Sequence, residues 1–243
     1  MTVKINHFLS LASVKKNNSA IFLGCGPSIR EIDQGFIDKL DNLDVWSSNS
    51  WIIHNTIVPD FYHVEVKAHR SGPLFKRLCV EKAEQYKDVN WIIDGTRPHL
   101  LEYVKPDLYS SIYAYPKYYR QDTSGNYPLH PQAVAVSNNA SLTVILDLMQ
   151  RMEYERIYFL GVDMYSSRYF WTDNPDYDSA QVPDIIKTCK PDERSPDSEH
   201  PTQKLKQFIV EFGEANQIEL INLSKNSLLS ETMKTVSIGD LDV

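Results

Sequence analysis

The stretch Ala20-Ile-Phe-Leu-Gly-Cys-Gly-Pro-Ser-Ile-Arg-Glu-Ile-Asp33 decides the fold class of this 243-residue chain. Its first four residues form an apolar run that is typical of a strand buried in a parallel sheet. Gly24 and Gly26 favour a tight turn in which the backbone can approach a ligand. Ser28, followed by Glu31, matches the capping box that begins a helix. We therefore expect a strand, a turn and a helix whose N-terminus could bind a phosphate.

The glycine spacing of this stretch does not identify a nucleotide class. Gly24-Cys-Gly-Pro-Ser28 is neither the Gly-x-Gly-x-x-Gly of dinucleotide folds nor a P-loop with its lysine. A strand, a turn and a helix with two glycines also occur as plain structure. The local sequence therefore leaves phosphate binding and a purely structural turn open.

Composition excludes several classes of protein. The net charge is −7 and the basic residues are scattered, which argues against a nucleic-acid partner. No apolar run reaches 18 residues, and the N-terminus is too polar for a signal peptide, so we expect a cytoplasmic protein with at most peripheral membrane contact. Cys25, Cys79 and Cys189 are odd in number and far apart, as in a reduced protein without a cysteine metal site.

Strand-like and helix-like segments alternate along the chain. The clearest helical periodicity runs from Asn139 to Met152, with Ser137 or Asn138 as its expected cap, and a second helix is predicted over 204–216. This alternation predicts an α/β fold, a Rossmann-like doubly wound parallel sheet with helices on both faces. The predicted strands are Ala20–Leu23, Asp44–Ser47, Phe61–Val66, Trp91–Asp94, Ser111–Tyr115, Arg156–Gly161 and Glu219–Leu223.

One region interrupts the alternation. Trp171 to Pro201 is rich in proline and acidic residues and is too long for an ordinary connection, so it is a lid or a solvated insertion. We expect a nucleotide-sugar-binding domain at 1–165 and 202–229, a lid or acceptor segment at 166–201, and a loosely held tail at 230–243.

Four separated segments together resemble the bacterial sialyltransferases of glycosyltransferase family 42. They are Gly24-Cys-Gly-Pro-Ser-Ile-Arg-Glu-Ile-Asp33, Asp44-Val-Trp-Ser-Ser-Asn49, the run from Ala140-Ser-Leu to Gly161-Val-Asp-Met-Tyr165, and Glu199-His200 through Asn226-Ser-Leu-Leu229. The resemblance implies inverting, metal-independent transfer of a sialic-acid-like sugar from a CMP donor to a glycan hydroxyl. No cofactor is expected, since the CMP-sugar is itself a substrate.

The resemblance also assigns roles to residues. His200 matches the catalytic base, and histidine suits that task because its ordinary pKa lies near 6.5. Tyr165 and Tyr169 match the hydroxyls that stabilise the leaving phosphate, although the loop between them is shorter than in the family. The implied nucleotide- and donor-binding residues are Gly24, Cys25, Gly26, Pro27, Ser28, Asn49, Ser141, Gly161, Asp163, Asn226 and Ser227.

The sequence departs from the family pattern around the sugar. Cys25 stands where the family carries asparagine, and Asn138 stands where it carries arginine. The segment ending in Glu65 replaces an asparagine-containing loop, and its His63 and Glu65 would face the same site. These changes indicate a related donor, such as Kdo, legionaminic acid or pseudaminic acid. The implied acceptor is a glycan or lipid-linked glycan of lipopolysaccharide or capsule biosynthesis, met at the inner face of the membrane, and a homo-oligomer is compatible with the sequence.

Three other functions remain open at this point. Asp176-Tyr-Asp178 spells the Asp-x-Asp of metal-dependent glycosyltransferases, although it lies in an acidic, proline-rich stretch rather than at a strand end. The glycine–proline–serine loop also resembles that of ATP- and magnesium-dependent pyrophosphokinases and of flagellin-modification enzymes. A non-catalytic protein that binds sugar nucleotides is the third alternative.

Overall fold

A parallel sheet of eight strands runs through the protein, in the order β1-β6-β5-β4-β3-β2-β9-β10. The computed structural model describes residues 5–65, 72–137, 140–164, 169–172, 174–177 and 201–241. The strands of the main sheet are β1 (Ile5–His7), β2 (Ser19–Leu23), β3 (Asp44–Ser48), β4 (Phe61–Val64), β5 (Asn90–Asp94), β6 (Ser111–Tyr115), β9 (Arg156–Leu160) and β10 (Glu219–Asn222).

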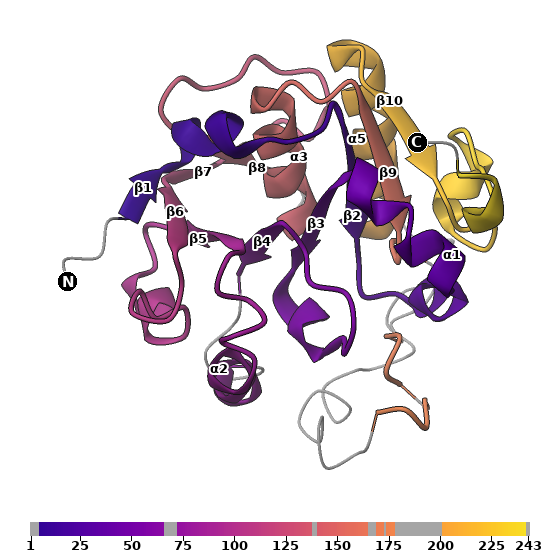
Figure 1. Ribbon diagram of the computed structural model, residues 1–243. Helices are drawn as coiled ribbons and strands as arrows, with labels where there is room; N and C mark the ends of the chain where they lie inside the picture. Colours follow the sequence, from indigo (N-terminus) through magenta and orange to yellow (C-terminus); the bar gives the residue numbers. More distant parts are fainter. Residues whose placement is uncertain are drawn as a thin grey trace.

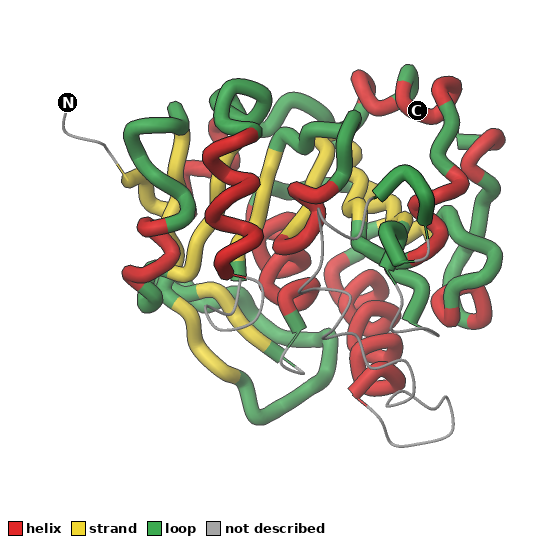
Figure 2. The backbone as a smooth tube through the Cα atoms, turned by 90° about the horizontal axis from the view of Figure 1, so that it is seen from below, coloured by secondary structure: helices red, strands yellow, loops and turns green. Residues whose placement is uncertain are grey.

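Helices cover both faces of the sheet (Figure 1). The α-helices are α1 (Gln34–Ile37), α2 (Gly72–Glu81), α3 (Ser141–Arg151) and α5 (Pro201–Asn216). Shorter 3-10 helices span Phe8–Val14, Pro27–Glu31, Leu40–Asn42, Asn49–Ile53, Pro98–Glu102, Leu228–Glu231 and Ile238–Asp240. Two further strands, β7 (Lys117–Tyr119) and β8 (Val134–Val136), form a small parallel sheet set apart from the main one (Figure 2).

The side chains of each strand pack alternately into two hydrophobic cores, one on each face of the sheet. On β2, Ile21 and Leu23 belong to the core covered by α2 and several 3-10 helices, whereas Ala20 and Phe22 face the core covered by α3 and α5. Successive side chains of a strand point to opposite faces, so a sheet with helices on both faces needs apolar residues at every position. This requirement explains the continuous apolar runs of β2 and β9.

The order of the strands reverses between β2 and β9. From β2, the chain moves through β3, β4, β5 and β6 on one side, while β9 and β10 lie on the other. The connections that leave β2 and β9 therefore lead to opposite sides of the sheet, and doubly wound sheets form ligand crevices at the carboxyl edge of such a switch point. The fold thus places the first glycine loop at the switch point.

The predicted fold class is confirmed, and each of the seven predicted strands is found within one or two residues in the part of the chain that the structure describes. The two predicted helices correspond to α3 and α5. The short strands β1, β7 and β8 and the helix α2 were missed. Three-residue strands carry too few positions to show a period of two.

The expected helix caps were wrong. Residues 27–31 form a short 3-10 helix whose first flanking residue, Gly26, makes no side-chain cap. The side-chain cap lies further on, where Asp33 accepts the N–H of Phe36 at the start of α1. At α3 the flanking residue is Ala140, and Ser137 instead exchanges hydrogen bonds with Thr143.

The described C-terminal residues pack on the domain, in contrast to the loosely held tail expected for 230–243. Ile238 and Leu241 are buried, and Lys39 Nζ donates to the carbonyl oxygens of Gly239 and Leu241 at 3.0 and 2.7 Å. Asn222 of β10 also exchanges backbone hydrogen bonds with the segment at 234–236. This part of the chain therefore extends the core beyond β10.

The expected lid is described only in part. Phe170 and Trp171 are buried, and Arg30 Nε donates to the carbonyl oxygen of Phe170 at 2.9 Å. This short piece of the 166–201 segment thus packs against the loop that follows β2. No helix among the described residues has the length and apolar character needed to cross a membrane.

Candidate functional site

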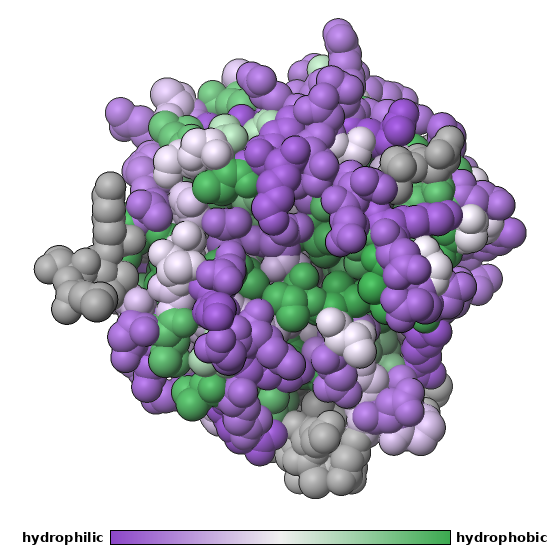
Figure 3. Space-filling model, viewed as in Figure 1, coloured by the Kyte–Doolittle hydropathy of each residue, from purple (hydrophilic) through white to green (hydrophobic). Residues whose placement is uncertain are grey.

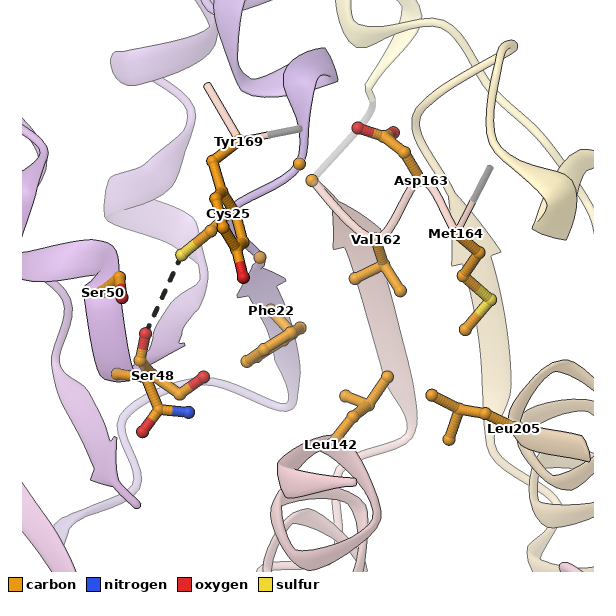
Figure 4. Close-up of a pocket in the computed structure, with 14 residues that line it drawn as sticks. Phe22, Cys25, Ser48, Ser50, Leu142, Val162, Asp163, Met164, Tyr169 and Leu205 are labelled. Atoms are coloured by element: carbon orange, nitrogen blue, oxygen red, sulfur yellow. Dashed lines mark hydrogen bonds between the residues drawn. The ribbon is translucent and has the colours of Figure 1, made fainter. Parts of the chain in front are cut away.

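A pocket of about 290 Å³ opens at the switch point between β2 and β9. Seven of the residues that the sequence predicted line it: Gly24, Cys25, Gly26, Asn49, Gly161, Asp163 and Tyr169. Seven others were missed: Phe22, Ser48, Ser50, Leu142, Val162, Met164 and Leu205. Figure 4 shows these side chains converging from the ends of β2, β3 and β9 and from α3 and α5. The pocket therefore combines an apolar floor with polar groups at its rim.

The floor is made by Phe22, Leu142 and Leu205, which come from β2, α3 and α5 (Figure 4). Apolar side chains also gather near the middle of the face drawn in Figure 3, with polar side chains around them. A mostly apolar lining with a few polar groups is typical of small-molecule sites. The sequence pattern gave no signal for Leu205, because only the packing of α5 brings it to the sheet edge.

The two glycines of the first loop serve close contact between loops. The Gly24 N–H donates to the Leu160 carbonyl at 2.7 Å, and the Gly26 N–H donates to the Gly161 carbonyl at 2.8 Å. A Cβ added at Gly24 would lie 2.3 Å from the Gly161 oxygen, and one at Gly26 would lie 2.3 Å from Asp163 Oδ2. The N–H groups of both glycines are therefore used within the protein, while the two residues line the pocket as the sequence predicted.

Asp163 ties the same two loops together. Its Oδ2 accepts the N–H of Ser28 at 2.9 Å, while the Ser28 hydroxyl accepts the N–H of Gly161 at 3.0 Å. Asp163 Oδ1 is buried and has no hydrogen-bond partner among the described residues. Asp163 lines the pocket, and its carboxylate holds that wall in place through Ser28.

Cys25 and Tyr169 face the pocket from neighbouring loops (Figure 4). Burial raises the pKa of the Cys25 thiol to about 12, so the thiol stays protonated. Its sulfur makes a long 4.0 Å contact with the Ser48 carbonyl. The Tyr169 ring stacks on Trp171 with centroids 4.5 Å apart. Tyr169 is thus held at the rim, whereas Cys25 supplies no nucleophile at neutral pH.

Asn49 links the pocket to a second group of polar residues. It follows β3 with a φ of 52°, in the left-handed region that asparagine tolerates better than most residues. Its Oδ1 accepts the Glu65 N–H at 2.7 Å, and its Nδ2 donates to Ser141 Oγ at 3.3 Å. Asn49 and Ser141, two of the predicted binding residues, are therefore in contact, although Ser141 does not line the pocket.

A charged cluster lies beyond Asn49, at the carboxyl ends of β4 and β5; it consists of Glu65, Asp94, Arg97 and Lys117. Glu65 Oε1 pairs with Lys117 Nζ and lies 3.7 Å from Arg97 Nη2. Asp94 Oδ2 lies 3.2 Å from Arg97 Nε and 3.8 Å from Lys117 Nζ. Two acids and two bases balance, so this cluster carries no net charge. The sequence placed Glu65 here but gave no signal for Lys117, which arrives from β7.

His63 of β4 is buried beside the charged cluster. Its Nε2 lies 2.7 Å from the Tyr115 hydroxyl, while its Nδ1 has no partner in the described structure. Burial lowers the pKa of His63 to about 4, so the ring is neutral at pH 7. Burial opposes ionisation of Glu65 as well, but its contacts with His63, Lys117 and Ser141 hold the Glu65 pKa below its ordinary value. Glu65 is therefore an anion at neutral pH.

Four further predicted residues lie near the pocket without lining it. Pro27 begins the 3-10 helix, and Ser28 is buried beneath the first loop. The Ser227 hydroxyl donates to the Val162 carbonyl at 2.7 Å, which anchors the loop after β10 to the loop after β9. Asn226 is exposed on that same loop. Ser227 thus acts on the position of the pocket wall rather than as a wall itself.

Some predicted residues lie outside the described part of the chain. His200, Tyr165, Asn138 and Asp178 are among them, so their contacts are not described. Among the described residues, no group of three histidine, cysteine or acidic side chains could hold a metal ion. Asp176, the other acid of the Asp-x-Asp, is exposed.

No known family model and no curated protein matches the sequence. Solved structures do match. The sialyltransferase CstII from Campylobacter jejuni, in complex with the substrate analogue CMP-3FNeuAc, is similar over 92% of this chain and 89% of its own, with a TM-score of 0.53 and 15% identity. The monofunctional α-2,3-sialyltransferase Cst-I of the same organism is similar over 94% of this chain and 84% of its own, with a TM-score of 0.55 and 14% sequence identity.

A third likeness is to the Maf glycosyltransferase from Magnetospirillum magneticum AMB-1. The TM-score is 0.57 at 17% identity, over 98% of this chain but 36% of that one, so this chain spans about a third of the larger enzyme. At such low identities a likeness of structures establishes the fold alone. The four sequence segments indicated a resemblance to sialyltransferases, and the comparison confirms this resemblance at the level of the fold.

Proposed function

We propose that this protein is a glycosyltransferase that moves a sialic-acid-like sugar from a CMP donor to a glycan hydroxyl. The pocket at the β2–β9 switch point carries this proposal, because it lies where doubly wound folds bind nucleotides. A solved complex of CstII, whose fold this chain shares, contains CMP. Asp163 lines this pocket and ties together the loops that form it. The proposed acceptor is a lipid-linked or free glycan.

The proposed reaction is a single inverting displacement without a metal. His200 would take the proton of the acceptor hydroxyl, and the hydroxyls of Tyr165 and Tyr169 would stabilise the leaving phosphate. The described neighbours of these residues support the assignment. Helix α5 begins directly after His200 and brings Leu205 to the pocket, while Met164, which precedes Tyr165, lines the pocket.

The test is a screen of CMP-activated sugars for enzyme-dependent release of CMP, with and without EDTA. We expect one of them to be turned over and the rate to survive chelation. His200→Ala should lower turnover by roughly 10²- to 10⁴-fold, the usual contribution of a general base, while CMP still binds. His130→Ala is the matched control, because His130 is exposed and lies away from the pocket.

The alternatives give different results in the same experiment. Selective thermal stabilisation by ATP and magnesium rather than CMP would favour a pyrophosphokinase and contradict the proposal. Binding of CMP without turnover of any CMP-sugar, on a panel of glycan acceptors, would favour a non-catalytic binding protein. Loss of transfer after chelation would overturn the metal-independent mechanism.

A further inference from the structure

The start of helix α3 already holds a carboxylate that belongs to the protein. Ser141, the first residue of α3, donates its hydroxyl hydrogen to Glu65 Oε2 at 2.7 Å. Asn49 closes the ring, since its amide contacts Ser141 Oγ at 3.3 Å and the Glu65 N–H at 2.7 Å. A helix N-terminus with a free hydroxyl would attract an acidic group. Here Glu65 takes that place.

Glu65 is held firmly in this position. Its other oxygen, Oε1, pairs with Lys117, whose side chain is 3% exposed, and Arg97 lies 3.7 Å away. A hydroxyl has one hydrogen to donate, so Ser141 cannot serve a second carboxylate while Glu65 accepts it. An additional anion there would also lie within a few ångströms of the ionised Glu65, and like charges at that distance disfavour binding.

We propose that Glu65 determines the sugar specificity of the site by occupying the anion position at the start of α3. The part of the sugar that meets this corner is then a hydroxyl or amino group, which can donate to Glu65, and the carboxylate of the sugar binds elsewhere. This inference rests on the proposed CMP-sugar function. Asn49 connects the corner to that function because it contacts both Ser141 and Glu65 and lines the pocket.

The experiment compares the dissociation constants of CMP and of the acidic analogue CMP-3FNeuAc by calorimetry at pH 7. For the wild-type protein, we expect the sugar to add less than about threefold to the affinity of CMP. Glu65→Gln keeps the shape but removes the charge, so the analogue should bind about tenfold more tightly while CMP changes less than threefold. Each tenfold step corresponds to about 1.4 kcal/mol.

A double-mutant cycle identifies the group responsible. Ser141→Ala should remove the tenfold gain in the Glu65→Gln background and change the ratio of the two constants less than threefold in the wild-type background. Glu65→Asp, which withdraws the carboxylate from Ser141 but keeps its charge near Lys117, should give a smaller gain; it serves if Glu65→Gln unfolds. Glu219→Gln is the matched control, because Glu219 also pairs with two basic residues, Arg156 and Lys234, but at the opposite edge of the sheet.

The possible failures are distinguishable. Unchanged or weaker binding of CMP-3FNeuAc by folded Glu65→Gln or Glu65→Asp, with CMP binding intact, would overturn the role of Glu65 and leave the proposed function standing. If the wild-type protein binds the analogue far more tightly than CMP, the role of Glu65 is likewise overturned and the proposed function still stands. Absence of binding for CMP and the analogue alike would overturn the proposed function together with this inference.

Discussion

The carboxyl edge of the sheet has two halves, one between β2 and β9 and one beyond β3, and different kinds of contact hold them together. Between β2 and β9, the contacts run from backbone to backbone, with glycines that leave no space for a Cβ. Beyond β3, the charged cluster of Glu65, Asp94, Arg97 and Lys117 is held by side chains. Backbone contacts fix the shape of a site, whereas paired side chains fix its charge. Substitutions should therefore affect folding in the first half and respond to pH in the second.

The largest expected effect is that of Gly24→Ala. Its new Cβ would lie 2.3 Å from the Gly161 oxygen, and a carbonyl in a paired backbone cannot move aside without opening the two loops. We expect the free energy of unfolding to fall by roughly 3 kcal/mol, the upper range for overpacking a tight site. Urea unfolding monitored by circular dichroism measures it.

Gly239→Ala is the control for that experiment. Apart from Gly239 and its two chain neighbours, no atom lies within 4 Å of the position of the new Cβ, so the unfolding free energy should stay within about 0.5 kcal/mol of the wild-type value. Equal effects of the two substitutions would show that the loops after β2 and β9 do not depend on close backbone contact.

The sequence predicted this half of the edge well for a physical reason. Apolar runs such as Ile21–Leu23 and glycines between elements are local signals, and they report directly on a buried strand and a tight turn. The local signals failed where a long-range contact replaced a local one. Ser28 looks like a helix cap in sequence, but its hydroxyl accepts the Gly161 N–H, 133 residues away.

The expected effect of intermediate size concerns His63, which is buried beside the charged cluster. We expect the folded protein to lose stability in acid because of this residue. The folded pKa of His63, about 4, is below the 6.5 of an unfolded chain, so only the unfolded state takes up a proton between these values. Stability is therefore present above pH 6.5 and is lost as the pH falls toward 4. From pH 7 to pH 5 this group alone should cost about 2 kcal/mol.

The measurement compares wild-type protein with His63→Gln in urea at pH 7 and pH 5. The variant should lose about 2 kcal/mol less over this interval, because it lacks the group that protonates on unfolding. His54, which is also buried with a lowered pKa, is common to both proteins, and Glu65 has a pKa below its ordinary value, so it adds little between pH 7 and pH 5. His130→Gln, at an exposed position, should follow the wild-type profile. Identical profiles for wild type and His63→Gln would contradict a neutral, buried His63.

This half of the edge was harder to foresee from sequence. His63 and Glu65 were expected at the site because they follow a predicted strand, but their partners come from distant elements. Lys117 reaches Glu65 from β7, a three-residue strand without a readable pattern, and Ser141 reaches it from α3. Charge pairing depends on side chains that meet only after folding, and no local spacing reports it.

The smallest expected effect is that of replacing Cys25, which lies in the half between β2 and β9. In the sequence, Cys25 was the strongest departure from the family pattern. Its thiol is a weak donor, 4.0 Å from the Ser48 carbonyl, and its pKa of about 12 keeps it uncharged. Cys25→Ala should therefore change the dissociation constant of CMP, measured by calorimetry, less than threefold. Cys25→Ser is the matched variant, since it restores a hydrogen-bond donor of similar size. The opposite outcome would be tenfold weaker binding of CMP by Cys25→Ala and wild-type binding by Cys25→Ser. It would show that this position recognises the nucleotide through a polar group. Side chains as well as backbone contacts would then determine the properties of the β2–β9 half.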